Sequence, residues 1–205
     1  MFTRTKRRSK PAATEAARKL EVTPTSVLSA HAATALDAYG QAGGPLATCD
    51  ASARLFLVLS DAVETDGRSG IWTLHFLLPN RHGEAVATVS SQASARGGYV
   101  VTASYDVTRF PRPGTVEWEL AQQPVMAEMF EDRWKARLAR LGGLPVPFTD
   151  SPDAIEAMRA TGAPLFSGGP VRLKGRTLPT GKPVWEAVIS TGTYHVPFSP
   201  YRWAG

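Results

Sequence analysis

Three acidic side chains that could hold a cation stand close together, Asp61, Glu64 and Asp66, and Gly67 follows them. Calcium takes about six to eight oxygen ligands, which carboxylates near a glycine turn commonly supply. The spacing here departs from the EF-hand pattern, because no later glutamate is placed to supply two oxygens at once. The segment predicts a solvated turn, so no metal site is assigned, and the three acids are candidate binding residues.

Two histidines, His75 and His82, flank a predicted turn, and His195 follows near the C-terminal end. Imidazoles on neighbouring strands can bind a metal ion or act as acid and base. The pattern places no carboxylate or cysteine partner beside them, so no catalytic residue is assigned. His75 and His82 are candidate binding residues. An enzyme that uses them with the loop 61–66 stays open as an alternative.

Cys49 is the only cysteine, which excludes an intrachain disulfide. A nucleophilic cysteine needs a nearby histidine to lower its pKa, and no local pattern supplies one. The chain also lacks a phosphate-binding glycine loop, a dinucleotide fingerprint and a Gly-x-Ser-x-Gly elbow. No cofactor is predicted, and the sequence contains none of the motifs that mark these common enzyme classes.

Five tryptophans are spread along the chain. Exposed indoles could form a platform on which nucleic-acid bases stack. Trp72, Trp134 and Trp185 lie on apolar stripes or strand faces, which favours packing into a core. For Trp118 and Trp203 the sequence leaves both packing and base stacking open, and both are candidate binding residues.

A hairpin at 71–89 is the clearest strand signal. Trp72, Leu74, Phe76 and Leu78 alternate with polar residues, and the segment 79–83 has the chemistry of a turn. The polar segments 60–70 and 90–98 are predicted loops. Further strands are predicted at 55–59, 99–105, 115–120, 170–176 and 182–191, with an aromatic edge strand or packed tail at 194–203.

Three helices are predicted from capping residues and apolar stripes. The first begins at Thr23-Pro24 and ends at Gly40, because Gly43, Gly44 and Pro45 follow. The second, Pro124–Leu141, carries acids early and bases late, in keeping with the helix dipole. The third begins at Ser151-Pro152 and ends at Gly162.

The order of elements repeats. Each half has a helix that starts at proline and ends at glycine, then a strand, a polar loop and a strand with a tryptophan near its start. We therefore predict an α+β protein in which helices pack on one face of antiparallel sheet, built from two related helix–strand–strand units. The expected organisation is a basic disordered arm (1–22), a first unit (23–143) with a bridging helix at 124–141, and a second, smaller unit (144–205). Trp72 and Trp185 should then have equivalent surroundings.

The second unit resembles a PepSY-type module in the segment 151–155, in Gly162 and in the segment 181–188 (Gly-Lys-Pro-Val-Trp-Glu-Ala-Val). The segment 66–76 (Asp-Gly-Arg-Ser-Gly-Ile-Trp-Thr-Leu-His-Phe) is similar in style. The Asp-x-x-Thr-Gly-like turn of that family is absent from both copies. The resemblance covers about half the chain. It implies a non-catalytic binding or inhibitory module, often exported, with a helix before a small antiparallel sheet.

The positive charge is concentrated at the start of the chain. Of 23 Lys and Arg residues, seven lie within 1–20, where Glu15 is the only acid, and the remainder is close to neutral. This arm, which includes Arg4, Lys6, Arg7, Arg8 and Lys10, could contact nucleic acid or acidic lipid. No secretory signal or membrane helix is predicted, and an organelle transit peptide is compatible with the composition.

These patterns favour a non-catalytic module that binds a protein or peptide partner. The alternative that the arm suggests is a subunit of an organellar or ribonucleoprotein assembly with a basic N-terminal anchor.

Overall fold

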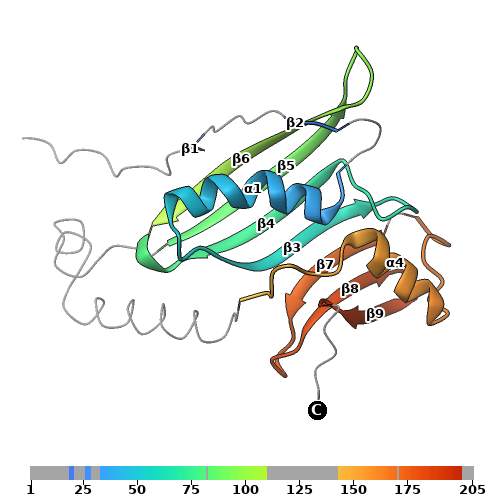
Figure 1. Ribbon diagram of the computed structural model, residues 1–205. Helices are drawn as coiled ribbons and strands as arrows, with labels where there is room; N and C mark the ends of the chain where they lie inside the picture. Colours follow the sequence, from blue (N-terminus) through green and yellow to red (C-terminus); the bar gives the residue numbers. More distant parts are fainter. Residues whose placement is uncertain are drawn as a thin grey trace, which may run out of the picture.

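A computed structural model describes residues 19–20, 26–28, 33–81, 83–109, 143–169 and 171–199. Within these ranges nine strands form a single antiparallel sheet in the order β1-β6-β5-β4-β3-β7-β8-β9, and β2 also pairs with β6 (Figure 1). The expected α+β class is therefore confirmed, although strands dominate the described residues.

The first part of the described chain supplies one helix and six strands. In chain order these are β1 (Lys19–Leu20), β2 (Ser26–Leu28), α1 (Ala35–Cys49), β3 (Arg54–Val63), β4 (Ile71–Leu78), the 3-10 turn η1 (Pro79–Arg81), β5 (Gly83–Ala93) and β6 (Tyr99–Arg109). The second part is shorter. It contains α4 (Ser151–Ala160), β7 (Val171–Thr177), β8 (Pro183–Ile189) and β9 (Gly192–Pro197).

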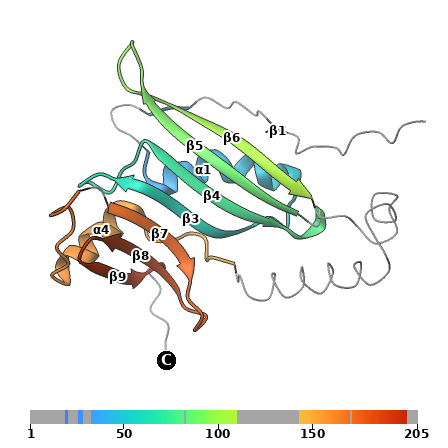
Figure 2. The same ribbon diagram turned by 180° about the vertical axis from the view of Figure 1, so that it is seen from behind.

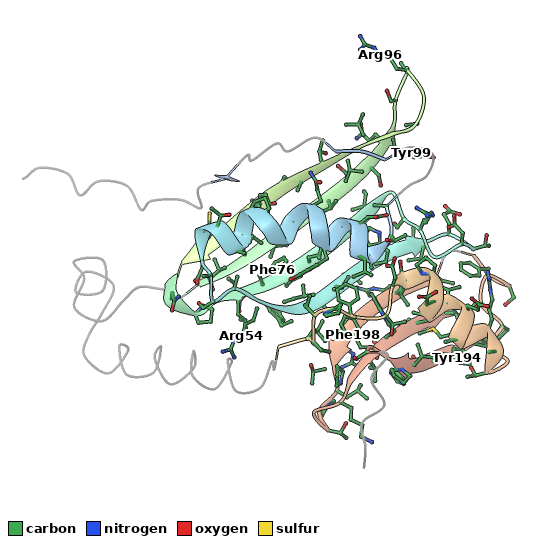
Figure 3. All side chains as sticks on the ribbon, in the orientation of Figure 1. Arg54, Phe76, Arg96, Tyr99, Tyr194 and Phe198 are labelled. Atoms are coloured by element: carbon green, nitrogen blue, oxygen red, sulfur yellow. The ribbon has the colours of Figure 1, made fainter. Side chains whose placement is uncertain are left out.

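Both helices lie on the same face of the sheet, as Figures 1 and 2 show from opposite sides. The helix α1 lies over β4, β5 and β6, and α4 lies over the part of the sheet that contains β9. The core between helices and sheet includes Trp72, Trp185 and Phe198, which are fully buried. The other face of the sheet carries neither helix, and we call it the open face.

The predicted helix 24–40 is wrong in position. Residues 26–28 form β2, and the helix begins at Ala35 after the cap residue Thr34. The Thr34 hydroxyl accepts a hydrogen bond from the Asp37 N–H, and the Asp37 carboxylate accepts one from the Thr34 N–H. This capping box fixes the start of the helix more firmly than Thr23-Pro24 could.

The same helix continues through the glycines that were expected to end it, and it contains Pro45. Its buried residues are small and recur every three or four positions: Ala35, Ala38, Ala42 and Leu46. Burial of this stripe against the sheet offsets the low helix propensity of glycine and the backbone donor that proline lacks.

The helix predicted at Ser151–Gly162 is confirmed as α4, with Pro152 in its first turn. The cap is Asp150, one residue earlier than expected, and its carboxylate accepts a hydrogen bond from the Ser151 N–H. The strands predicted at 55–59, 71–89, 99–105, 170–176 and 182–191 correspond to β3 through β8. Both predicted loops are too long, because β3 continues to Val63 and β5 continues to Ala93.

The two halves form one sheet, since β3 pairs antiparallel with β7. Val58 pairs with Gly175, Leu59 with Lys174, and Ser60 with Leu173. Hydrogen-bonded strand pairing is thus continuous across the sheet from β6 to β9.

Several expectations fall outside the described residues. These are the strand 115–120, the helix Pro124–Leu141, His82, Trp118, Trp203 and the arm residues Arg4, Lys6, Arg7, Arg8 and Lys10. Within the arm predicted at 1–22, Lys19 and Leu20 pair with Asp106 and Tyr105 of β6.

Candidate functional site

Charged side chains gather on the open face where β7, β8 and β9 lie together. Residues two apart in a strand share a face, so Arg172, Lys174 and Arg176 of β7 point away from the helices while Val171 and Leu173 are buried. Glu186 of β8 pairs with Lys174 on one side and with His195 of β9 on the other. The sheet register therefore assembles one mixed-charge cluster across three strands.

The centre of the cluster is the Glu186 carboxylate. Its Oε2 atom lies 2.5 Å from Arg176 Nη2, 3.1 Å from Arg176 Nε and 3.0 Å from His195 Nε2. The Glu186 side chain is 9% exposed, whereas Arg176 is 32% and His195 is 40% exposed. A nearly buried acid is thus covered by two groups that reach solvent.

Electrostatics keep this acid ionised. Burial raises the pKa of Glu186, but hydrogen bonds from Arg176 and His195 and the charges of Arg176 and Lys174 outweigh it, so the pKa lies below its usual value. The cluster contains no serine or cysteine nucleophile. Its exposed chemistry is hydrogen bonding and charge recognition by His195, Arg176 and Lys174.

The candidate acids make structural contacts, and one of them, Asp61, contacts the charged side chains of β7. Asp61, near the end of β3, forms an ion pair with Arg172 at 2.8 Å, and Asp66 lies 3.6 Å from Arg68. The loop turns through hydrogen bonds from the Glu64 N–H to the Arg68 carbonyl and from the Gly67 N–H to the Glu64 carbonyl. The solvated-turn prediction agrees with this geometry.

The same loop is held against α4. Arg159 Nη2 donates to the Thr65 carbonyl at 2.7 Å. Gly67 has φ +80°, and a Cβ built there would lie 2.4 Å from the Pro152 Cα. The loop thus connects the two halves of the molecule.

His75 lies on the open face of β4, apart from these acids. Its ring meets Phe56 edge to face with centroids 5.6 Å apart. It pairs with Leu57, which is four residues, or about 13 Å of strand, from Asp61. The enzyme alternative therefore gains no shared site from His75 and the loop 61–66. No group of three potential metal-ligating side chains occurs in the described part of the chain.

The N-terminal ends of the two helices meet in a hydrogen-bonded polar cluster. The Ala35 N–H donates to Ser151 Oγ and the Leu36 N–H donates to Asp150 Oδ1, both at 3.0 Å. Asp150 thereby caps its own helix and contributes to capping α1. These contacts satisfy backbone donors that helix ends leave unpaired, and they join the two halves.

The two buried tryptophans have matching partners. Trp72 Nε1 donates to the Ala33 carbonyl at 2.9 Å, and Trp185 Nε1 donates to the Thr149 carbonyl at 2.7 Å. Ala33 lies two residues before the first residue of α1, and Thr149 lies two residues before that of α4.

Sequence reasoning did not find the Arg176–Glu186–His195 cluster. The signal was present as basic residues at every second position of β7 and as a glutamate between Val184 and Val188 on one strand face. The missing information was the register, which places Glu186 beside His195.

None of the described helices is both long enough and apolar enough to cross a bilayer. The chain matches no family model, no curated protein and no solved structure.

Proposed function

We propose that this chain is a non-catalytic module of PepSY-like tandem type that binds a protein or peptide partner on the open side of the strands β7, β8 and β9. The observation that carries the binding role is the Arg176–Glu186–His195 cluster. It holds one nearly buried acid in place while the arginine and histidine remain available to a partner.

The tandem part of the proposal is supported first by the tryptophans. In each half the indole of the second strand donates to the carbonyl two residues before the helix of that half. One indole could do this by chance, but the same donor, acceptor position and strand in both halves favour two copies of one unit.

The helices support it second. Aligned on their first residues, Ala35 corresponds to Ser151, Ala38 to Ala154 and Ala42 to Met158, and all six are buried. The acids Asp37 and Asp153 also fall at the same position.

The junction supports it third. The pairs Val58–Gly175 and Ser60–Leu173 lie on either side of the pair Leu59–Lys174. A pseudo-twofold axis through that middle pair would exchange β3 with β7 and the first unit with the second.

Peptide selection on the folded full-length chain tests the proposal. We expect a related set of sequences to be enriched, and we expect His195→Ala to weaken their binding about tenfold, since a factor of ten corresponds to the loss of one good hydrogen bond. Thr180→Ala, in the exposed turn before β8, is the matched control and should leave binding unchanged. If no sequence is enriched over the heat-unfolded chain, or if both variants bind alike, the proposal fails.

The charge of residues 1–20 favours a second candidate, a subunit that the arm anchors to RNA or acidic lipid. Deletion of residues 1–18 leaves β1 in place. Loss of heparin and RNA retention at moderate salt, with thermal stability unchanged, would support this candidate. Retention by the truncated chain would exclude it.

A further inference from the structure

The two edges of the sheet differ. At one end β6 is partly covered, because β1 pairs with Tyr105 and Asp106 and β2 pairs with residues 99–101. At the other end, in the residues that the structure describes, β9 pairs only with β8. Unpaired backbone groups at such an edge are a template for another strand.

The backbone groups that β9 presents can be identified from the ladder. The Phe198 N–H donates to the Pro183 carbonyl, so residue 198 faces β8. Antiparallel pairs alternate, and therefore Gly192, Tyr194 and Val196 also face β8. Thr193, His195 and Pro197 face outward. Pro197 has no N–H, and because its backbone faces outward it removes no hydrogen bond to β8. This outward side is where an edge strand tolerates proline.

The first half of the molecule shows what can occupy the equivalent edge. Trp72 pairs with Val89 of β5, and Trp185 pairs with Val196 of β9, so β5 and β9 hold the same place beside their tryptophan strands. The outer side of β5 is fully paired with the antiparallel strand β6. The second half contains no counterpart of β6 within the described residues.

We propose that the edge of β9 accepts an extended segment of a partner protein as an antiparallel strand, in the place that β6 takes beside β5. This inference rests on the proposed binding function and specifies its mode. Affinity would come from backbone hydrogen bonds to Thr193 and His195, and specificity from alternate side chains.

The chemistry of the partner strand follows from its neighbours. In β6 the side chains of Val101, Ala103 and Tyr105 face the helices and are buried, while Thr102 and Ser104 lie on the open face. On β9, Tyr194 packs against the core on the helix side and His195 lies on the open face. His195 uses Nε2 toward Glu186, which leaves Nδ1 on the other side of the ring. The fitting partner alternates apolar residues with serine or threonine and places a hydroxyl beside His195.

The probe is a capped peptide with the β6 sequence Val-Thr-Ala-Ser-Tyr-Asp-Val, residues 101–107. Since Val89 of β5 corresponds to Val196 of β9, Thr88 corresponds to His195. Ser104 lies opposite Thr88 in β5, so Ser104 of the peptide would lie opposite His195. Titrated into the isotope-labelled full chain, it should shift the amide signals of Thr193 and His195 and slow their hydrogen exchange. The inward amides of Tyr194 and Val196 should already be protected without it.

Two N-methylated peptides provide matched controls that leave the protein unchanged. Methylation at Ser104, whose N–H would face β9, should weaken binding about tenfold. Methylation at Ala103, whose N–H would face away, should change it by less than about twofold. Equal losses, or no shift at Thr193 and His195 at millimolar peptide, would overturn the inference.

Other outcomes separate this inference from the function on which it rests. If selected peptides bind and depend on His195 but protect neither outward amide, the binding function stands and strand addition is refuted. A different outcome is that sedimentation shows a dimer in which the outward amides of β9 are already protected. If the peptide does not dissociate that dimer, strand addition by a partner is likewise refuted.

Discussion

The rings of Trp72 and Trp185 meet edge to face at the centre of the core, with centroids 6.5 Å apart and planes at 66°. Both side chains are fully buried, although they lie 113 residues apart in sequence. Each ring anchors the start of its own helix through its N–H group. The contact thus connects both helices and both halves of the sheet.

Replacing either tryptophan with phenylalanine should therefore lower the free energy of unfolding by more than the loss of side-chain volume alone would. Trp72→Phe and Trp185→Phe each remove a hydrogen bond to a carbonyl, and each should lower the free energy of unfolding by about 1–3 kcal/mol. Since the rings touch, the double variant should depart from additivity by about 0.5–1.5 kcal/mol in urea unfolding. Strict additivity would mean that the two rings do not share one packed site.

The turns before β4 and β8 supply a matched pair of glycines. Gly67 and Gly181 have nearly the same φ, +80° and +82°, but a Cβ at Gly67 meets the Pro152 backbone while one at Gly181 meets nothing within 4 Å. Gly181→Ala should cost about 1–2 kcal/mol from backbone strain alone. Gly67→Ala should cost about 2–5 kcal/mol, because overpacking adds to the strain. Equal thermal shifts would show that the loop does not press on α4.

Gly175 makes room for Phe198. A Cβ on this residue would lie 2.3 Å from Phe198 Cε2, and neighbouring strands hold its backbone on both sides. Gly175→Ala should destabilise the fold by about 1–3 kcal/mol. In a Phe198→Leu background, Gly175→Ala should destabilise the fold clearly less. If the destabilisation is unchanged, the added methyl group does not clash with Phe198.

Alternation located most of the sheet in advance. Strands β4 and β7 carry apolar residues at every second position, and that pattern depends only on one face being buried. Strand ends were less predictable, because Ser60 and Asp61 are polar yet continue β3 through pairing with β7 and an ion pair with Arg172.

The position of α1 could not be obtained from local propensity. Gly40, Gly43, Gly44 and Pro45 all disfavour a helix, and burial of small residues on the sheet overrides them. The capping box Thr34–Asp37 was visible in the sequence, but Thr23-Pro24 offered a competing start. Tertiary packing decided between them.

The loss of folding stability at acidic pH should depend on Glu186. Its pKa is lowered in the folded state, so its stabilisation is present above the ordinary value of 4.5 and is lost as the pH falls through the lower folded value. Arg176 and His195 are partly exposed, so solvent screening weakens their contribution. Urea unfolding from neutral to acidic pH should show a smaller acid loss for Glu186→Gln than for the native chain. Parallel curves would assign the acid sensitivity to other carboxylates.

The loss of folding stability at alkaline pH should depend in part on Tyr105. Burial, and second the neighbouring Cys49 thiol, raise its pKa from 10.0 to about 12. Its hydroxyl lies 3.3 Å from the Ala42 carbonyl and 3.5 Å from the Gln41 carbonyl. The residue four positions after Gln41 is Pro45, which has no backbone N–H to donate. The folded state holds the phenolic proton more tightly than the unfolded state. The stabilisation is therefore complete below pH 10 and is lost as the pH rises toward 12.

Phenolate absorbance and unfolding over the same pH range test this assignment. Tyr105→Phe should remove the phenolate titration near pH 12 and flatten the alkaline loss of stability, which a shift of this size puts at about 2–3 kcal/mol. Tyr99→Phe, at the half-buried start of the same strand, is the matched control and should keep both features. If Tyr105→Phe retains the late titration, the alkaline unfolding begins at another group, and the hydroxyl does not compensate for Pro45 in α1.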